Sequence, residues 1–421
     1  MTYKEYDINN IKLYIHKTNK FKTIKMNFMF INEYDKNDFT KHKLLNKILK
    51  KSTKNNNDEI KMSKKAVSLY NPYIRIFDIF KNIHEKNFQY TFINEKYSEE
   101  GMNKQNLEFL LDIIFNPNII NNEFEKSNFN LCKDELKISY DLNEENPNYV
   151  ADELAYLNLS IDVPCKYQKN GCKKDLIKIN EKNLYDFYLN EIRNSEIKIF
   201  VVGDVKEDDF YNLIKAYLSN IESLKENFKE IDYTINTFNK SKEIIEKKNF
   251  NQSILIMLYS VVNISEYERK YVLPLLNILL GGNSFKLFNN VREKNSLAYY
   301  ISSYIIKSDS IFEIEAGISK ENYNKTISLI NRQIEEVKNC NITDEEMNNI
   351  INLVKSILND IEDDMSSLLS AFIEIVHLNK KSPKELLKMY KKVTKEEISS
   401  LAKKLNLDVQ FLLEGNDNEN N

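Results

Sequence analysis

The stretch of sequence that decides the fold runs from Leu280 to Tyr299 and reads LGGNSFKLFNNVREKNSLAY. An apolar run with helical periodicity precedes it, and Gly281 and Gly282 are residues that commonly end such a helix. No Gly-Lys-Ser or Gly-Lys-Thr follows, so these glycines do not form a phosphate-binding loop. Considered alone, Arg292 and Glu293 are typical of an exposed charged turn. By itself the stretch predicts a helix, a turn and the start of a strand.

The composition of the chain excludes several classes of protein. Its 421 residues include 60 Lys and Arg against 63 Asp and Glu, which gives a net charge of -3. This balance argues against a polycationic nucleic-acid binder, whose affinity comes largely from neutralised phosphates. Because His is the commonest metal ligand, the presence of only four His leaves little room for a metal centre. The four Cys are irregularly spaced and predict reduced thiols rather than a redox pair or a zinc site.

Two features of the sequence predict a cytoplasmic protein without a membrane partner. The N-terminus MTYKEYDINN is charged and polar where a signal peptide needs an apolar core. The longest apolar runs extend over about ten residues, which is half of the roughly 20 that a membrane helix requires. We therefore expect neither nucleic acid nor membrane among the partners.

Alternating and amphipathic runs follow one another along the chain and predict an α+β fold. Strands are predicted at Lys12–His16, Lys25–Ile31, Phe88–Ile93, Ile197–Val202, Ser253–Leu258, Tyr299–Ile306, Ile311–Ile318 and Val409–Leu413. Helices are predicted at Lys43–Lys51, Asn106–Phe115, Asn122–Leu136, Lys182–Ile192, Glu266–Leu280, Asn322–Val337, Asp344–Ile361 and Lys395–Leu405. Two capping boxes, Thr343-x-x-Glu346 and Thr394-x-x-Glu397, mark helix starts in the second half.

The order of these elements predicts a duplicated chain. Residues 179–203 run through a helix into an apolar strand that ends in Gly, and residues 393–415 do the same, at an offset of about 214 residues (393 minus 179). This period is too long for a solenoid repeat. We therefore predict two tandem homologous domains, 1–221 and 249–421, each a mainly antiparallel sheet packed with helices. The polar segment 222–248 is predicted to be the linker.

The stretch 280–299 resembles the second-domain motif of the M16 metallopeptidases, the family of insulinase, pitrilysin and the mitochondrial processing peptidase. The shared order is Leu-Gly-Gly, then Leu-Phe, Arg-Glu and Leu-Ala-Tyr. In the family the Arg and the Tyr bind substrate, so the resemblance implies substrate-binding roles for Arg292 and Tyr299. A guanidinium and a phenol can donate hydrogen bonds to a peptide carbonyl or to an oxyanion. One departure is Ser296, where the family usually has Gly. Further similarity near residues 164–204 and 312–317 extends the resemblance over most of the chain.

The zinc-binding half of the family pattern is degenerate in this sequence. M16 peptidases carry His-x-x-Glu-His on a helix, and the best-matching segment here places Lys43, Asn46 and Lys47 at the two His positions and the Glu position. Two ammonium groups repel Zn²⁺, and an amide cannot take a proton from water. Glu135 resembles the third ligand, but alone it is a weak site and is expected to be a solvated or paired carboxylate. We expect no metal and no catalytic residue at these positions.

The four histidines do not restore a zinc motif in the sequence. His16 ends a predicted strand, His42 lies beside Lys43, His84 falls in a predicted polar loop and His377 lies on an apolar helical run. Each is expected to be structural or solvated. The prediction is therefore that this chain has no cofactor of its own.

The resemblance implies a subunit of a two-chain M16 peptidase of the M16B type. In such heterodimers one chain holds zinc and its partner supplies the Arg/Tyr pair. The length and the Lys20-Phe21-Lys22-Thr23 segment most resemble zinc-free bacterial homologues associated with elongation factor P modification or modified-peptide maturation. The first hypothesis is a non-catalytic subunit that pairs with a zinc-bearing paralogue and binds a peptide substrate. The alternative is a peptide-binding or scaffold protein without a role in proteolysis. An active enzyme with an unrelated site has little support, because no other catalytic constellation stands out.

Overall fold

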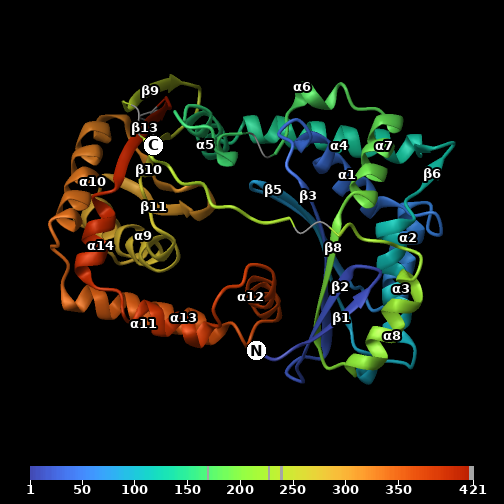
Figure 1. Cartoon of the computed structure of the whole chain (residues 1–421). Coiled ribbons are helices and arrows are strands. Elements are labelled where there is room, and N and C mark those ends of the chain that lie inside the picture. Colours follow the sequence, from blue (N-terminus) through green and yellow to red (C-terminus); the bar gives the residue numbers. More distant parts are fainter. Residues whose placement is uncertain (168–169, 226–227, 238–239, 417–421) are drawn as a thin grey trace. The chain divides into compact units, whose positions relative to one another are not determined.

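The protein is built of strands and of helices that pack on them (Figure 1). The computed structural model describes residues 1–167, 170–225, 228–237 and 240–416. The chain divides into two compact units. The first comprises Met1–Tyr140, Lys169–Glu230 and Asn359–Ser382, and the second comprises Asp141–Gln168, Ile231–Leu358 and Pro383–Asn421. Each unit holds a mainly antiparallel sheet packed with helices, so the predicted α+β class is confirmed.

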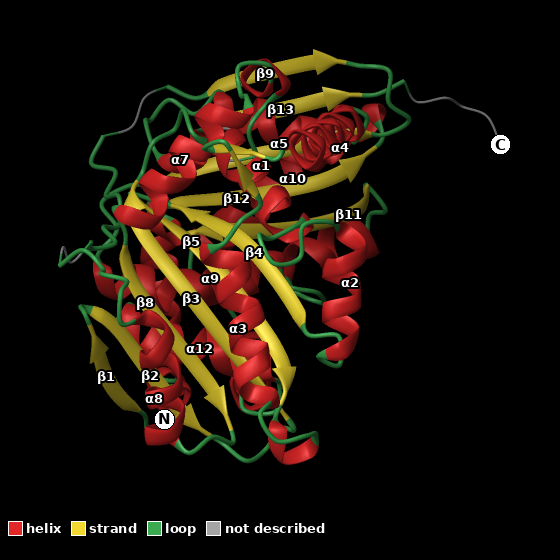
Figure 2. Ribbon diagram, turned by 90° about the vertical axis from the view of Figure 1, so that its right-hand side faces the viewer, coloured by secondary structure: helices red, strands yellow, loops and turns green. Residues whose placement is uncertain are grey.

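The sheet of the first unit has six strands in the order β1-β2-β8-β3-β5-β4. Their bounds are β1 (Lys4–Ile8), β2 (Ile11–Lys17), β3 (Thr23–Glu33), β4 (Tyr73–Phe80), β5 (Ile83–Ile93) and β8 (Glu196–Gly203). All neighbours are antiparallel except β2 and β8, which pair in parallel. The long strands β3, β5 and β8 run through the middle of this sheet (Figure 2).

The sheet of the second unit has five strands in the order β11-β12-β10-β13-β9. Their bounds are β9 (Lys242–Lys247), β10 (Ser253–Val261), β11 (Ala298–Ile306), β12 (Ile311–Ile318) and β13 (Leu405–Glu414). Again a single pair, β13 with β9, is parallel. Read from the opposite edge, this order is β9-β13-β10-β12-β11. It matches the order β2-β8-β3-β5-β4 of the first unit, and the single parallel pair lies at the same place in both. This match supports the predicted duplication.

The helices follow the same repeated plan. In the first unit they are α1 (Phe39–Lys51), α2 (Glu59–Ser68), α3 (Met102–Phe115), α4 (Lys126–Glu144, whose last residues lie in the second unit), α6 (Lys173–Leu176), α7 (Glu181–Arg193), α8 (Glu207–Leu218) and α12 (Met365–His377). In the second they are α5 (Pro147–Leu157), α9 (Leu273–Gly281), α10 (Tyr323–Lys338), α11 (Asp344–Asp360, whose last residues lie in the first unit), α13 (Pro383–Tyr390) and α14 (Lys395–Ala402). Within the described ranges, none of these helices combines the length and the apolar composition that crossing a bilayer requires.

Both faces of each sheet are buried, and the strand sequences show why. On β3, Met26 and Phe28 point into the cluster formed with α1, α3 and α7, whereas Met29 and Ile31 point into a second cluster on the opposite face. On β10, alternate residues divide in the same way between two clusters. Because successive side chains of a strand point to opposite faces, a strand buried on both faces must be apolar nearly throughout. Each sheet therefore needs helices on both sides.

The helix on the second face comes from the other half of the chain in both units. Helix α12 belongs to the C-terminal half of the sequence but packs on the first sheet, where Leu368, Leu369 and Phe372 meet Phe200 and Val202 of β8. Helix α5 belongs to the N-terminal half but packs on the second sheet, against β10 and β13. The two halves have thus exchanged one helix each.

Because of this exchange, the bounds of the compact units differ from those of the predicted domains. Predicted domains 1–221 and 249–421 are continuous, whereas the compact units are discontinuous, since segment 141–168 lies in the second unit and segment 359–382 in the first. The segment predicted as a linker, 222–248, contributes β9 to the second sheet. The physical reason is that an apolar sheet face is covered by whichever segment reaches it, and sequence position does not decide this.

Most predicted elements lie where the structure has them, including β12 at Ile311–Ile318 and the capping boxes of Thr343 and Thr394. Three helix starts are displaced by four residues, since the helices predicted from Lys43 and Asn106 begin earlier, at Phe39 and Met102, and a third begins later. The helix predicted from Asn122 begins at Lys126, because residues 119–124 form the short hairpin β6 (Ile119–Ile120) and β7 (Glu123–Phe124). Asn121 and Asn122 adopt φ values of 53° and 62°, and Asn is one of the few residues that tolerates this left-handed conformation in a tight turn.

Docking of α12 can be tested at Phe372, which is fully buried and whose ring meets that of Phe200 at 5.7 Å between centroids. The substitution Phe372→Ala should lower the free energy of unfolding by about 3 kcal/mol or more, because it leaves a cavity between helix and sheet. Leu353→Ala, at a position 40% exposed on α11, is the control and should change it by less than about 0.5 kcal/mol. Denaturant unfolding measures both. Equal effects would show that α12 is not packed on the sheet.

Docking of α5 predicts a pH dependence of stability. Tyr156 of α5 donates a hydrogen bond of 2.5 Å to Glu313 of β12. Burial raises the pKa of Glu313 from 4.5 to about 8, against the opposing hydrogen bond from Tyr156 and with help from Asp152 and Glu315. A carboxyl whose pKa is raised in the folded state contributes stability that is complete below its unfolded pKa and is lost as the pH rises through its folded pKa. The loss therefore falls between about pH 4.5 and pH 8.

The substitution Glu313→Gln should remove much of this pH dependence, since the amide mimics the neutral carboxyl. At pH 8 the variant should be more stable than the wild type by about 1–3 kcal/mol, with little difference at pH 4.5. Urea unfolding across this pH range measures the effect. Glu246→Gln, at an exposed position of β9, is the control and should track the wild type. A variant that loses stability equally at both pH values would contradict the prediction.

Candidate functional site

Helix α1 carries three of the positions predicted from the family motif. Its apolar face is buried in the first core, through Leu44, Leu45, Ile48 and Leu49, and the helix contacts β4, α3 and α7. Lys43 and Lys47 lie one turn apart and are half-buried. Asn46 lies on a more buried side and is 8% exposed. The three motif positions thus lie on one helix, as the sequence predicts, but they carry Lys and Asn in place of the His and Glu of the zinc motif.

Glu135 on α4 is paired with two lysines of α1. Its carboxylate lies 2.9 Å from Nζ of Lys51 and 3.6 Å from Nζ of Lys47. The hydrogen bond from Lys51 is the main reason that the pKa of Glu135 is lowered. Lys51 also lies 3.2 Å from Glu59 of α2. The structure therefore brings Lys47 and Glu135 together, and the positive charge beside this carboxylate is supplied by the chain itself.

These side chains do not fit a zinc ion of the family type. A zinc site needs imidazole, thiolate or carboxylate donors. The Lys47 ammonium, held in an ion pair, has no lone pair to give. Burial lowers the pKa of Lys43, while Asp78 opposes this shift. Among the motif positions only Glu135 is a ligand type, and it is already neutralised by lysines.

Asn46 has a structural role in the first core. Its Nδ2 donates to Oδ2 of Asp78 at 2.5 Å, and its Oδ1 accepts from Nζ of Lys86 at 2.8 Å. Lys86 and Asp78 form an ion pair of 2.8 Å. Burial alone would raise the pKa of Asp78, but Lys86 and two histidines hold it well below its ordinary value. An amide satisfies both partners at once, because it offers a donor and an acceptor.

Sequence reasoning missed how two histidines are placed. His84 was predicted in a polar loop, but it is the second residue of β5 and only 1% exposed. It meets His42 of α1, with 3.9 Å between ring centroids. The loop prediction is wrong because the turn between β4 and β5 is short and leaves His84 paired with Phe80 in the sheet. The signal in the sequence is misleading, since His84 opens a run of four polar residues, His84 to Asn87, and such a run is typical of a loop.

Arg292 lies in the second unit, on a π-helical turn at Phe288–Glu293. Its side chain is 44% exposed, with the guanidinium 5.0 Å from the centre of the Phe288 ring and Nε 3.8 Å from Glu293. The turn ends at Ser296, whose φ of 49° is a conformation that favours glycine. This explains the usual Gly of the family at that position. Gly281 also has a packing role, because an added Cβ would overlap Ser303 of β11.

Tyr299 lies at a β-bulge. On β11, Ala298 pairs with Ile318 and Tyr300 with Gly317, so Tyr299 is an extra residue without a counterpart. It is 65% exposed, and β11 is an edge strand. Bulges commonly redirect a side chain next to functional sites. Arg292 and Tyr299 are therefore both available to a ligand of the second unit.

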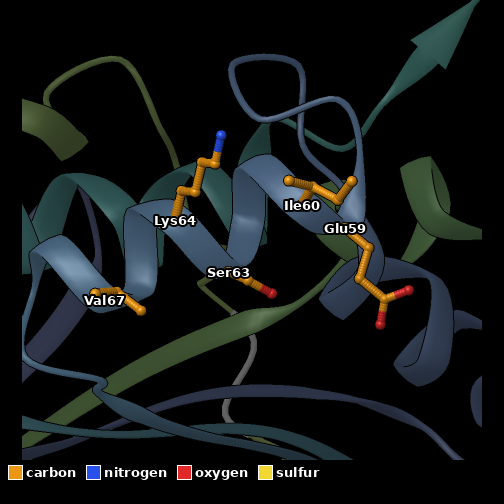
Figure 3. A pocket seen from close by; sticks show the side chains of 5 residues that line it. All are labelled: Glu59, Ile60, Ser63, Lys64 and Val67. Atoms are coloured by element: carbon orange, nitrogen blue, oxygen red, sulfur yellow. The ribbon is translucent and has the colours of Figure 1, made fainter.

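A shallow pocket of the first unit lies on the outer side of α2. It is lined by one helix face, with Glu59, Ile60, Ser63, Lys64 and Val67 (Figure 3). Ile60 and Val67 are 68% and 65% exposed. No predicted site residue lines it, and its polar groups do not converge as they do in catalytic pockets.

Comparisons with known proteins agree with this architecture. Residues 178–354 match the Peptidase M16 inactive domain. A probable inactive metalloprotease of Bacillus subtilis, YmfF, is 26% identical over 422 residues, which cover 96% of this chain and 95% of that protein. An uncharacterized zinc protease of the same organism, YmxG, is 25% identical over 264 residues, or 62% of each chain.

Solved structures show the same fold. A conserved protein from Enterococcus faecalis V583 has a TM-score of 0.88 and 25% identity, covering 99% of this chain and 100% of that one. A protease from Helicobacter pylori has a TM-score of 0.80 and 15% identity, covering 98% and 99% of the two chains.

The repeated strand order defines a duplicated α+β fold, in which the positions that the motif resemblance assigns to zinc carry Lys43, Asn46 and Lys47. Residues 178–354 form a domain of the Peptidase M16 inactive type, and nearly the whole chain is similar to a protein named as a probable inactive metalloprotease.

The role of Asn46 yields a prediction about why the family glutamate is absent. Asn46→Asp would place a second carboxylate against Asp78 and remove the donated hydrogen bond. We expect the free energy of unfolding at pH 7 to fall by about 2–4 kcal/mol. Asn349→Asp, at an exposed position of α11, is the control and should be nearly neutral. Chemical denaturation measures both variants, and a fully stable Asn46→Asp protein would show that the amide is not needed there.

Proposed function

We propose that this chain is the non-catalytic subunit of a two-chain M16-type peptidase. The observation that carries the proposal is the contrast between its two motif regions. The Arg292 and Tyr299 positions are kept and exposed, whereas Lys47 and Lys51 pair with Glu135 where the family binds zinc. A zinc-bearing paralogue would supply the metal, and this chain would supply peptide-binding groups.

The local geometry of the second unit supports a ligand-binding role. An exposed Tyr on a bulged edge strand has a free phenol to donate, and edge strands also offer unpaired backbone groups to an extended peptide. Packing of the Arg292 guanidinium near Phe288 limits its rotamers, which lowers the entropic cost of binding a carbonyl or a carboxylate.

The relatives support a division of labour. One organism holds both a protein named as a probable inactive metalloprotease and one named as a zinc protease, and both are similar to this chain. In a two-chain peptidase, one chain activates water at the metal while the other positions the peptide and stabilises developing charge.

The proposal is tested by reconstitution. The full chain is mixed with an HxxEH-bearing M16 paralogue from the same source, and cleavage of a peptide library is followed by mass spectrometry. Neither chain alone should cleave at an appreciable rate, and the mixture should. Arg292→Ala and Tyr299→Phe should each lower kcat/KM about 10- to 100-fold, the expected effect of losing one or two hydrogen bonds to the substrate.

Two matched variants control for indirect effects. Arg332→Ala removes an arginine that is 72% exposed on α10, and Tyr304→Phe removes a phenol that is 49% exposed on the same strand as Tyr299. Both should leave cleavage unchanged. A mixture that cleaves equally well with Arg292→Ala and Tyr299→Phe would overturn their substrate-binding role. A complex that forms without any cleavage would favour a scaffold instead.

A further inference from the structure

A second polar cluster lies in the core of the first unit, next to the motif position Asn46, which donates a hydrogen bond to Asp78 of the cluster. It consists of His42 on α1, Asp78 on β4, His84 on β5 and Glu191 on α7. The side chains of these four residues are 5%, 0%, 1% and 8% exposed, respectively. Burying so many ionisable groups is costly unless each finds a partner.

The pairing of β4 with β5 and the alternation of side chains along each strand place several of these residues on one face. On the β4–β5 hairpin, Asp78 is directly opposite Lys86 and Phe80 is directly opposite His84. Positions two apart on a strand share a face, so all four side chains lie on one side of the hairpin. Helix α1 adds His42 next to Asn46, one turn on. Aromatic rings orient the imidazoles, since Phe80 stacks on His84 at 4.9 Å and 19°.

Helix α7 completes the cluster by the same rule. Phe187 packs against His42 edge-on, with 4.8 Å between ring centroids and 77° between planes, and Glu191 follows one helical turn later. Thus α1, α7 and the two strands β4 and β5 each contribute one residue to the cluster.

Hydrogen bonding fixes which nitrogen of His84 is free. Its Nε2 lies 2.8 Å from Oδ1 of Asp78, a carboxylate oxygen that can only accept, so Nε2 carries the proton. In the neutral imidazole the lone pair is then on Nδ1. A carboxylate that accepts from one ring nitrogen and so orients the other is the usual outer partner of a metal-binding histidine.

Three polar atoms of the cluster have no hydrogen-bond partner among the residues that the structure describes. They are Nδ1 of His42, Nδ1 of His84 and Oε2 of Glu191. Oε2 of Glu191 lies 3.4 Å from Nδ1 of His84 and 3.8 Å from Nδ1 of His42, yet it forms a hydrogen bond with neither. Each histidine Nδ1 thus lies within 3.8 Å of the same carboxylate oxygen, and one shared partner could satisfy these three buried atoms.

We propose that His42 Nδ1, His84 Nδ1 and Glu191 Oε2 bind a transition-metal ion of the Zn²⁺ type. Two imidazoles and one carboxylate are a donor set that zinc prefers, and adjacent donors of a tetrahedral zinc lie about 3.4 Å apart. The two donor separations of 3.4 and 3.8 Å are close to this value. Asp78 accepts from His84 and orients it, and it is already neutralised by Lys86.

This site differs from the family zinc motif and departs from the expectation that the chain holds no metal. It shares no residue with Lys43, Asn46, Lys47 and Glu135. Because its ligands are buried, the ion would be structural and would link α1, the β4–β5 hairpin and α7. It does not depend on the proposed partner chain or on cleavage.

Metal content of the full chain tests the proposal directly. The protein is refolded with Zn²⁺ or Co²⁺, since its buried ligands would exchange slowly in the folded state, and is desalted. Native mass spectrometry should find one ion per chain, and the Co²⁺ form should absorb visible light. His84→Gln and Glu191→Gln should each weaken binding by about 100-fold or more, beyond the 10- to 100-fold typical of an outer partner. Zinc should raise the Tm of the wild type by at least about 5 °C and that of these variants by much less.

Two control variants separate this site from the alternatives. His377→Gln changes another buried histidine of the first unit, whose Nε2 lies 3.3 Å from Glu85. Glu135→Gln changes the family motif position. Both should keep full metal content. A wild-type chain that retains no ion after refolding with metal would overturn the proposal and leave a water molecule or a shared proton in the cluster. Equal binding by wild type and Glu191→Gln would overturn it as well.

Discussion

Burial of both faces of each sheet is the constraint on which the rest of this structure depends. On strands such as β3 and β10 the residues that point to either face of the sheet are apolar, so neither face can be left in water. Each repeat supplies helices for one face of its own sheet. The second face is covered by α12 in one unit and α5 in the other, and both come from the opposite half of the chain. A repeat by itself would expose an apolar sheet, which explains why the two halves occur as one chain.

The same constraint governs polar groups at the helix–sheet boundaries. Helix α5 places Tyr156 against Glu313 of its sheet, and helix α12 places His377 against Glu85 of the other. In both units a buried glutamate on the sheet is met by a donor from the exchanged helix. Making such a hydrogen bond adds little net stability, but leaving either buried group unpaired is costly. The bond therefore favours one docking position of the helix.

Charged and polar side chains around α1 are paired where the motif resemblance would place zinc ligands. Lysines now neutralise Glu135 on one side of the helix, and Asn46 bridges Lys86 and Asp78 on the other. Part of this could be predicted, since the sequence predicts that Glu135 is either a solvated or a paired carboxylate, and the structure shows it paired. The exact partners could not be predicted, because Lys51, Asp78 and Lys86 lie at separations that no local pattern encodes. Similarly, the positions of Arg292 and Tyr299 followed from the motif, but the bulge that exposes Tyr299 depends on its register with β12.

The sequence by itself determined the α+β class, the duplication, the resemblance to M16 peptidases and the replacement of their zinc motif, because periodicity and motif order are local properties. Only the tertiary structure decided which helix covers which sheet face, and that His42, Asp78, His84 and Glu191 share one buried point. The period of each helix or strand determines only on which face of that element the side chain lies. Their meeting depends on contacts between elements distant in sequence, which form when apolar faces of several elements are buried together.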